Sequence, residues 1–370
     1  MEKKKNDFIA QGSILAIASI LVRVMGMIYR IPMTAIIGDK GNGFYSYAYS
    51  VYTILLLLSS YSLPLAVSKM VSAKAQLGQW RNVKRVFICA IAFAIGIGTT
   101  FGLIVLIGAQ FFTRVFFHSE LAAIALRFMA PTILIMALLG VFRGFFQGLQ
   151  NTLPTAVSQI VEGLINAIMS VVFAYFLFDF GHGMDVASGT TDLGYAWGAA
   201  GGAIGTGAGA LAGLIFCFIL FVAYRKILAV NISRDKTGTQ QEYGDIFRLM
   251  LSIALPVILS TALYNLIELV DGSLFNNIMA SKGMEDVKDS MWGAYNAKAL
   301  LLVHIPVSIS SAMAVSLVPT LTAAYALGDE QTAKSKVHAI LRFISILAFP
   351  SAVGLLVLAN PIIKTLFSGD

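Results

Sequence analysis

The sequence predicts an all-α polytopic membrane protein with two pseudo-symmetric helical lobes around a central cavity, the second lobe being incomplete in this chain. Of its 370 residues, 58% are hydrophobic and 12% are charged. Soluble domains carry about 25% charged residues, so this composition excludes an ordinary soluble protein. Nine apolar segments are long enough to cross a bilayer, which takes about 20 residues. Part of the chain also recurs at a spacing of about 250 residues.

The nine predicted spans are separated by short segments rich in glycine, proline or charge. They cover residues 8–37, 44–75, 83–109, 121–146, 154–178, 195–224, 246–279, 291–326 and 337–367. Residues 38–43 and 179–194 have the composition of loops. We divide the chain into an N-terminal lobe of six spans, residues 1–236, and a partial C-terminal lobe of three spans, residues 237–370.

Positive charges are concentrated in alternate loops. The N-terminus and the segments 76–85, 225–248 and 328–342 are basic, whereas the loops between them on the other side carry few positive charges or are acidic. By the positive-inside rule, the N-terminus is predicted to be cytoplasmic. The net charge of +7 then reflects orientation in a lipid bilayer, and we expect no nucleic-acid partner.

An internal repeat relates the two predicted lobes. The matching pairs are 66–68 with 314–316, 77–78 with 327–328, and 44–47 with 292–295. The interval holds six spans, so both copies have the same orientation, and the lobes would be related by a pseudo-two-fold axis along the membrane normal, as in many transporters. A chance alignment of apolar helices is the alternative. The second copy stops after three spans, so we expect these residues to be the N-terminal part of a longer protein that has at least three more helices.

The first span contains two arginines, Arg23 and Arg30. An arginine near the middle of a membrane helix costs roughly 2.5–3.5 kcal/mol on insertion scales. Seven residues at ~100° each return to nearly the same helix face, about 10 Å along the axis. Because guanidinium groups bind phosphate oxygens bidentately, the pair predicts an inward-facing phosphate or pyrophosphate site. Alternatively, one or both arginines snorkel or pair with buried acids.

Three acidic residues within predicted spans are candidates for such pairing. Glu162 lies in the fifth span, while Glu268 and Asp271 lie three residues apart in the seventh and so share one helix face. These acids either pair with the arginines or bind a coupling H⁺ or Na⁺.

Two further ionisable residues lie in the eighth span. Lys298, near its start, is either an interfacial anchor or a cavity cation, and His304 fits a hydrogen-bonded interior group better than a proton relay. The two cysteines, Cys89 and Cys217, fall inside apolar spans, and their spacing supports neither a metal site nor a disulfide framework.

Glycines recur every four residues along the sixth span and predict a close-packing seam between helices. They are Gly201, Gly205, Gly209 and Gly213. Motifs of metalloproteases, Walker A nucleotide sites, serine hydrolases and paired-cysteine sites do not occur. We therefore expect no enzyme activity, no metal, no cofactor and no transport driven by ATP hydrolysis within this chain.

Residues 143–151, Arg-Gly-Phe-Phe-Gln-Gly-Leu-Gln-Asn, followed by residues 154–159 and Glu162, resemble the signature of polysaccharide biosynthesis proteins of the stage V sporulation protein B type. That family belongs to the multidrug/oligosaccharidyl-lipid/polysaccharide (MOP) exporter superfamily, alongside the MurJ-type lipid II flippases. The resemblance covers nearly the whole chain and implies a MOP/MATE-like fold, with 12 to 14 helices in full-length members.

The resemblance extends to charged residues of the MurJ type. Their first helix carries two arginines needed for function, and Arg23-Val24-Met25-Gly26 followed by Arg30 is similar, with one extra residue before the second arginine. Lys298, six residues after Trp292, stands where they carry an essential arginine in the eighth helix. Gly43 stands where they carry a further acid, and no arginine of the second span matches theirs.

The resemblance implies a flippase for an undecaprenyl-pyrophosphate-linked saccharide, lipid II or a related cell-envelope precursor, acting by alternating access in the bacterial cytoplasmic membrane. Arg23, Arg30 and Lys298 would hold the lipid pyrophosphate, and an H⁺ or Na⁺ gradient could drive transport. Its partners would be the polyprenyl-linked glycan, the bilayer and cell-wall synthesis proteins. The alternatives are a MATE-like small-molecule exporter, a membrane enzyme such as a saccharide polymerase, and a non-transporting partner of the cell-wall or sporulation machinery.

Overall fold

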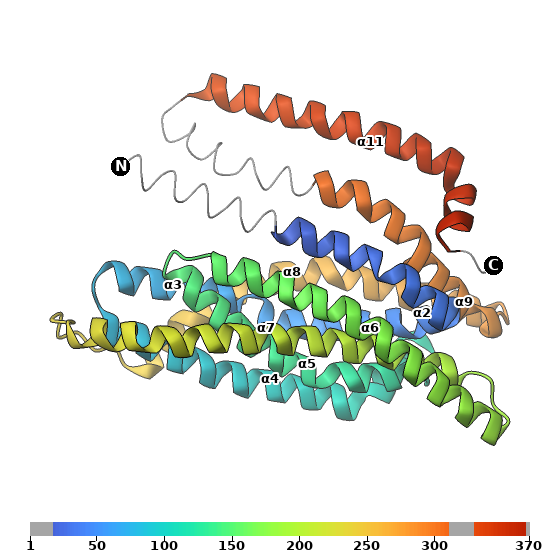
Figure 1. The fold of residues 1–370 in the computed structure, drawn as a ribbon, viewed down its shortest axis with the longest axis horizontal. Coiled ribbons are helices and arrows are strands. Elements are labelled where there is room, and N and C mark those ends of the chain that lie inside the picture. The colour runs from blue at the N-terminus through green and yellow to red at the C-terminus, as the bar shows by residue number, and fades with distance from the viewer. Residues whose placement is uncertain (1–17, 311–328, 368–370) are drawn as a thin grey trace.

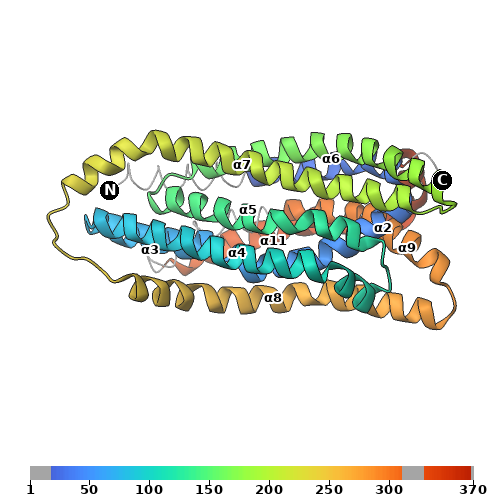
Figure 2. The ribbon, with the colours of Figure 1, turned by 90° about the horizontal axis from the view of Figure 1, so that it is seen from below.

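The structure, a computed structural model, describes residues 18–310 and 329–367. The regular elements of these ranges are all helices, and most lie close to parallel along one long axis (Figure 1, Figure 2). They are the segment Ala18–Ile28, α2 (Arg30–Leu56), the π-helical turn η1 (Leu57–Tyr61), α3 (Leu63–Gln76), α4 (Trp80–Phe117), α5 (Ala122–Gly148), α6 (Leu153–Ser188), α7 (Leu193–Ser233), α8 (Tyr243–Ser281), α9 (Glu285–Ala294), the π-helical turn η2 (Tyr295–Ala299) and α11 (Glu330–Leu366). The predicted all-α class is confirmed.

Seven helices of the described residues are long and apolar enough to cross a membrane. One of them, Arg30–Gln76, contains the end of the predicted first span together with the second. Residues 8–17 of the first span and 311–326 of the eighth lie outside the described residues. The described part of the eighth span consists of α9, η2 and the helical residues 300–310.

The chain reverses direction at Gly38, within the run of residues assigned to α2. Gly38 has φ 61° and ψ −176°, a backbone conformation that side chains disfavour, and the residues around it are helical. Arg30 lies within electrostatic range of Tyr45 and Tyr49. Along a straight helix, the 19 residues from Arg30 to Tyr49 would span about 28 Å. The contact therefore requires the turn at Gly38.

The turn divides this part of the chain into a first limb, residues 18–37, and a second limb, residues 39–56, which run antiparallel (Figure 1). The loop predicted for residues 38–43 is wrong, because one glycine suffices for the reversal and helix resumes directly after it. The glycine-rich composition of this stretch has another cause, which is the close approach of a second helix described below.

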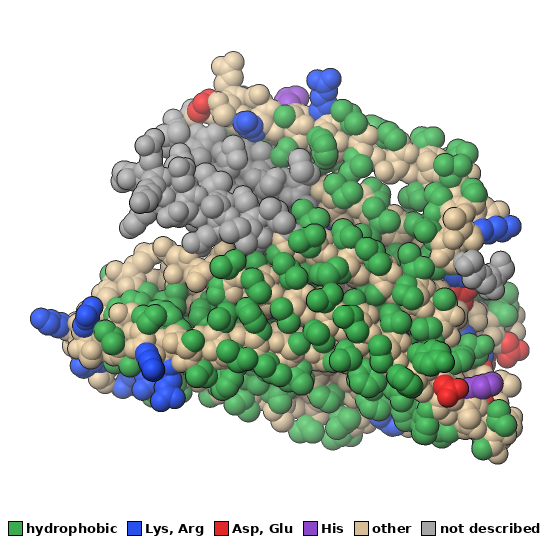
Figure 3. All heavy atoms as spheres, viewed as in Figure 1, with side chains coloured by type: hydrophobic (Ala, Val, Ile, Leu, Met, Phe, Trp, Pro, Cys, Tyr) green, Lys and Arg blue, Asp and Glu red, His purple; other side chains and the backbone are tan. Residues whose placement is uncertain are grey.

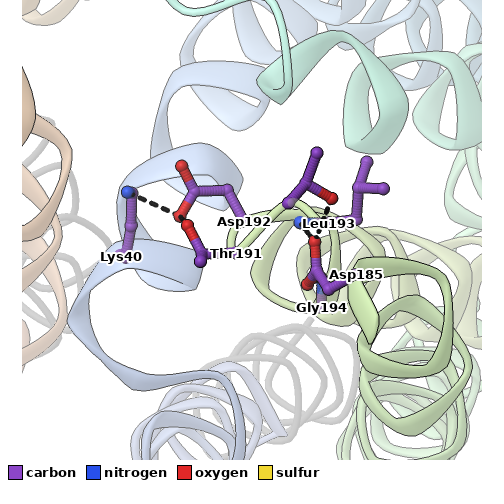
Figure 4. A network of polar contacts seen from close by, with 7 residues as sticks. Lys40, Asp185, Thr191, Asp192, Leu193 and Gly194 are labelled. Carbon is purple, nitrogen blue, oxygen red and sulfur yellow. Dashed lines mark hydrogen bonds and ion pairs between the residues drawn. The ribbon is translucent and has the colours of Figure 1, made fainter. Parts of the chain in front are cut away.

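The loop predicted for residues 179–194 is also wrong. Only residues 189–192 connect α6 to α7. The Asp185 carboxylate makes this short connection possible, since it accepts hydrogen bonds from the backbone N–H groups of Leu193 and Gly194 at 3.0 and 2.8 Å (Figure 4). A carboxylate in this position satisfies free N–H groups of the helix start and complements the helix dipole.

The predicted glycine seam of α7 is confirmed as a contact with α6. A Cβ atom on Gly201 would overlap the backbone of Phe173 and Ala174, and one on Gly205 would overlap the backbone of Ser170. Farther along, a Cβ on Gly209 would lie 2.6 Å from the Glu162 carbonyl oxygen. Glycine at these positions lets the two helix backbones approach as closely as they do.

The motif of residues 143–151 is a packing motif in the folded protein. A Cβ on Gly144 would lie 2.6 Å from the Pro64 carbonyl oxygen, and one on Gly148 would lie 2.8 Å from the Ser68 carbonyl oxygen. Both contacts join the end of α5 to α3. The glycines that carried the family resemblance therefore hold two helices of the N-terminal lobe together.

Residues 234–242 link α7 to α8 and lie against the start of α4. Asp235 accepts hydrogen bonds from the Arg81 backbone N–H and from the backbone N–H and hydroxyl of Thr237, which lower the pKa of its carboxyl to about 2. The Asn82 side chain bonds to the Thr239 carbonyl oxygen and the Gln241 N–H. These contacts fix the start of α8 relative to the start of α4.

Basic side chains gather at one end of the molecule, on the left in Figure 3. This basic end contains the α3–α4 turn and the 234–242 linker, with Arg81, Lys84, Arg85, Arg234 and Lys236. The opposite, acidic end contains the α6–α7 connection and the start of α9, with Asp185, Asp192, Glu285 and Asp286. The folded chain thus brings two of the segments predicted to be basic, 76–85 and 225–248, to one end.

The α7–α6 seam yields a stability prediction. Gly205→Ala adds a methyl group that overlaps the Ser170 backbone, and overpacking of this kind costs about 1–3 kcal/mol. We expect the variant to unfold at a lower temperature than the parent in a detergent-based thermal melt.

The control is Gly96→Ala on α4, where nothing lies within 4 Å of the added methyl group. It should leave the melting temperature unchanged or raise it slightly, because alanine favours a helix more than glycine does. Equal melting temperatures for the two variants would contradict the seam's role.

Candidate functional site

A cavity of about 960 Å³ lies between the two limbs and the helices of the C-terminal lobe. The first limb contributes three lining residues, the second limb three, α8 five, and the segment 291–304 the remainder. The lining residues are Gly26, Met27, Arg30, Tyr45, Ser46, Tyr49, Asn265, Ile267, Glu268, Asp271, Phe275, Met291, Trp292, Tyr295, Asn296, Leu300, Leu301 and His304.

Arg30 is the only lysine or arginine among the described residues that line this cavity. Its guanidinium lies within electrostatic range of Tyr29, Tyr45 and Tyr49. Tyr45 is fixed in turn by a 3.3 Å hydrogen bond to Thr206 of α7. Arg30 is therefore a half-buried cation close to three tyrosine side chains on one wall of the cavity.

Arg23 lies on the same face of the first limb as Arg30, about 10 Å nearer the basic end. Its side chain is exposed, and it is not among the described residues that line the cavity. Its neighbours Val22 and Met25 pack against Gly163 of α6. The structure thus places Arg30 inside the cavity and Arg23 beside it.

Two carboxylates, Glu268 and Asp271, line the opposite wall of the cavity on α8. Neither forms an ion pair with a described residue; Glu268 accepts a long hydrogen bond of 3.4 Å from the Ser50 hydroxyl. Tyr49 lies within electrostatic range of both Arg30 and Glu268. The cavity is therefore lined, among the described residues, by one cationic side chain, Arg30, and by two carboxylates.

The π-helical turn η2 shapes the third wall. Tyr295 and Asn296 at its start face the cavity, whereas Lys298 forms a 2.8 Å ion pair with Asp39, just after the turn at Gly38. A π-helical turn shifts the register of a helix and is frequent at functional sites. In this conformation Lys298 is engaged by Asp39 and is not among the described lining residues. His304, in the helical residues that follow η2, also lines the cavity.

The third predicted acid, Glu162, lies within the N-terminal lobe and not among the described residues that line the cavity. Its carboxylate pairs with Arg143 at 2.7 Å, and Arg143 also donates to the Ser158 hydroxyl at 2.8 Å. Arg143 belongs to the motif of residues 143–151, and the pair ties α5 to α6. The predicted acids therefore have different surroundings: one is paired, and two face the cavity.

The two lobes meet at the acidic end through a reciprocal contact between the second limb and α9. A Cβ on Gly43 would overlap the carbonyl of Asp289, and a Cβ on Gly293 would overlap the carbonyl of Asp39. Asp39 and Gly43 match Asp289 and Gly293 at a spacing of 250 residues, two more than the spacing that pairs 44–47 with 292–295. Two equivalent segments that contact each other reciprocally are related as by a two-fold axis. Equivalent segments of the two repeat copies are therefore in contact here.

Further contacts surround the reciprocal contact. Tyr47 stacks on Phe117 with ring centroids 4.7 Å apart and donates a 3.0 Å hydrogen bond to Asn276 of α8. Lys288 donates to the carbonyl oxygens of Phe117 and His118 at 3.0 and 2.7 Å, where α4 ends. Cations are favoured at the C-terminus of a helix. The lobes are therefore closed against each other at the acidic end.

The turn at Gly38 is also tied to the N-terminal lobe. Lys40 forms a 2.7 Å ion pair with Asp192 in the α6–α7 connection (Figure 4). Asp39 and Lys40 thus point to different lobes, the first to Lys298 and the second to Asp192. This one turn joins both halves of the molecule at the acidic end.

Sequence reasoning missed Asp39, which supplies the acid of this turn, and the tyrosines Tyr45 and Tyr49 beside Arg30. A usable signal existed for the first, because Asp-x-x-x-Gly occurs at 39–43 and again at 289–293. The tyrosines recur four residues apart on one helix face, but tyrosine at that spacing is also common in ordinary packing.

The comparisons with known proteins agree on a family. The family described as "Polysaccharide biosynthesis protein" matches residues 8–324. The lipid II flippase MurJ of Bacillus subtilis is 26% identical over 94% of this chain and 64% of its own length. The stage V sporulation protein B of the same organism is 24% identical over 99% of this chain and 68% of its own length. The chain thus spans about two thirds of the length of these relatives.

Solved structures show the fold. An inward-facing multidrug resistance MATE family transporter of the MOP superfamily superposes with a TM-score of 0.70 at 14% identity, over 94% of this chain and 72% of its own. A MOP superfamily transporter from Pyrococcus furiosus gives 0.61 at 16% identity, over 98% of this chain and 75% of its own. The chain belongs to the polysaccharide biosynthesis protein family and has the fold of the MOP superfamily transporters.

Proposed function

We propose that the protein translocates an undecaprenyl-pyrophosphate-linked saccharide, lipid II or a related cell-envelope precursor, across the bacterial cytoplasmic membrane by alternating access. The observation that carries the proposal is Arg30, a guanidinium held at the wall of an interlobe cavity within a membrane-spanning fold. An ionisable residue at such depth is kept for a function in most membrane proteins. The similarity to the lipid II flippase MurJ of Bacillus subtilis supports the substrate class.

The pyrophosphate would bind at Arg30 because a guanidinium presents paired N–H donors to phosphate oxygens and stays charged at any depth. Arg23, on the same helix face nearer the basic end, would meet the phosphates as they enter. The polyprenyl tail would remain in the lipid while the saccharide occupies the cavity.

The closed acidic end supports a cycle of alternating access. The reciprocal contact of residues 39–43 with residues 289–293 blocks the cavity on that side, so substrate would enter from the basic end. The positive-inside rule assigns the basic end, and with it the N-terminus, to the cytoplasm. The described conformation would then be the one that accepts substrate from the cytoplasm.

Lys298 would take part in the other half of the cycle. It is held by Asp39 while the acidic end is closed. When the lobes separate there, the ion pair would break and the ammonium group would become available to the pyrophosphate as it leaves Arg30. Glu268 and Asp271 are the acids placed to respond to an H⁺ or Na⁺ gradient, since Glu162 is already paired with Arg143.

A MATE-like exporter of small cationic molecules is the second candidate. The two cavity-facing carboxylates, Glu268 and Asp271, favour it, because a cation binder needs unpaired acids. Arg30 in the same cavity disfavours it. The flippase requires Arg30, whereas an exporter of small cations requires the two carboxylates. Substitution of Arg30 therefore distinguishes the two candidate functions.

Removal of the Arg30 guanidinium tests the proposed function. We expect Arg30→Ala to slow flipping of a fluorescent lipid II analogue in proteoliposomes by about 10–100-fold, because a charge-assisted hydrogen bond contributes about 1.5–3 kcal/mol. Arg23→Ala should slow it less, since Arg23 lies outside the cavity lining.

The matched control is Arg127→Ala, which removes an exposed arginine of α5 that is not among the described lining residues. It should flip the analogue at the parental rate. Unchanged flipping by Arg30→Ala, with its fold intact in a thermal melt, would sink the assignment of the pyrophosphate to this residue.

The reciprocal contact gives a second prediction, on conformation. Gly293→Val places a branched side chain against the Asp39 carbonyl, so the acidic end should no longer close. In a background with Cys89→Ala and Cys217→Ala, a cysteine introduced by Asn276→Cys reports on access, because Asn276 is buried beside this contact. We expect labelling by a membrane-impermeant maleimide from the outer face to rise about tenfold.

Gly354→Val, on α11 where nothing lies within 4 Å of a Cβ, is the control and should leave labelling low. If Gly293→Val also left the cysteine protected, the contact would not be what closes the acidic end.

A further inference from the structure

The charged side chains that line the cavity do not complement a substrate whose charges are all negative. Arg30 contributes one positive charge among the described lining residues, while Glu268 and Asp271 contribute two negative charges. A pyrophosphate group brings further negative charge. Like charges that are not compensated raise the free energy of binding. A positive group on the substrate would offset the two carboxylates.

The positions of the carboxylates define where that group would lie. Glu268 and Asp271 are three residues apart, so both face the cavity from one side of α8, and neither is ion-paired with a described residue. Tyr49 lies within electrostatic range of both Arg30 and Glu268. A ligand that fills this cavity could therefore reach the guanidinium with one group and the carboxylates with another.

Aromatic rings line the cavity next to the carboxylates. Phe275 and Trp292 lie with ring centroids 5.2 Å apart, and Trp292 and Tyr295 lie 5.5 Å apart, which makes a continuous aromatic surface. Aromatic faces attract cations and pack well against apolar faces of ring-shaped ligands.

We propose that Glu268 and Asp271 bind a protonated amino group carried by the saccharide headgroup whose pyrophosphate is held at Arg30. The substrate class is then a zwitterionic headgroup, a lipid-linked saccharide with a free primary amine, and its sugar ring lies against Phe275, Trp292 and Tyr295. This inference rests on the proposed function, and it adds the specificity of the acidic side. Headgroups that lack the amine are disfavoured, because they leave two carboxylates facing a pyrophosphate without a counter-charge.

The test compares two fluorescent undecaprenyl-pyrophosphate disaccharides that differ in one group. One carries an aminoethyl substituent, and the other carries the same substituent N-acetylated and uncharged. In proteoliposomes of the full-length protein we expect the amine probe to flip roughly tenfold faster than the acetylated probe. Glu268→Gln and Asp271→Asn, measured separately, should abolish the preference, so that in each variant the amine probe flips at the rate of the acetylated probe.

The control is Asp245→Asn, which makes the same chemical change in the first turn of α8, away from the cavity. It should keep the preference for the amine, and thermal melts should show all variants folded. Equal rates for the two probes in the parent protein, or a preference that survives both substitutions, would overturn the inference while the proposed function stands. An equal loss of both probes in the variants would also overturn it, and would assign the acids to ion coupling. Failure of the parent protein to flip either probe would overturn the proposed function itself.

Discussion

The backbone contact between the second limb and α9 is the constraint on which the described architecture depends. Gly43 and Gly293 let each helix approach the carbonyl of the other copy's aspartate, and no larger residue fits at either position. Because the contact is reciprocal and made by backbone atoms, it fixes the relative position of the two lobes at the acidic end with few side-chain contacts. The cavity exists because the lobes meet at this end and diverge behind it, with Arg30 on one side and α8 on the other.

The charged residues are arranged around this contact in a consistent way. Asp39 pairs with Lys298 across the lobes and Lys40 pairs with Asp192 within one lobe, so the turn at Gly38 is fixed on both sides. Deeper in the molecule, Arg30 is surrounded by tyrosines and does not pair with Glu268 or Asp271. Among the described residues, the partly buried ion pairs therefore occur where the lobes close or where helices are tied together, as in Arg143–Glu162. The charged groups of the described lining residues do not pair with one another.

Hydropathy and glycine spacing predicted the helices and the α6–α7 seam, because membrane spans and small-residue seams depend on local composition. The reversal after the first span was predicted at residues 38–43, but its restriction to Gly38 was not. Glycines at 41 and 43 have the composition of a loop, whereas their actual role is close packing. The partner of Lys298 lies 259 residues away. Likewise, the sequence placed Glu162, Glu268 and Asp271 in one class, and only the three-dimensional arrangement separates the paired acid from the two that face the cavity.

Photocrosslinking tests the central claim that the lipid pyrophosphate enters the cavity beside Arg30. Tyr295 lines the cavity, and Tyr175 is an equally large, exposed side chain on α6 that is not among the described lining residues. A photoreactive phenylalanine analogue would replace each in turn, with a radiolabelled polyprenyl-pyrophosphate saccharide as the substrate. We expect crosslinking at position 295 that requires Arg30, and little at position 175. Equal crosslinking at both positions, or crosslinking at 295 that persists in Arg30→Ala, would contradict it.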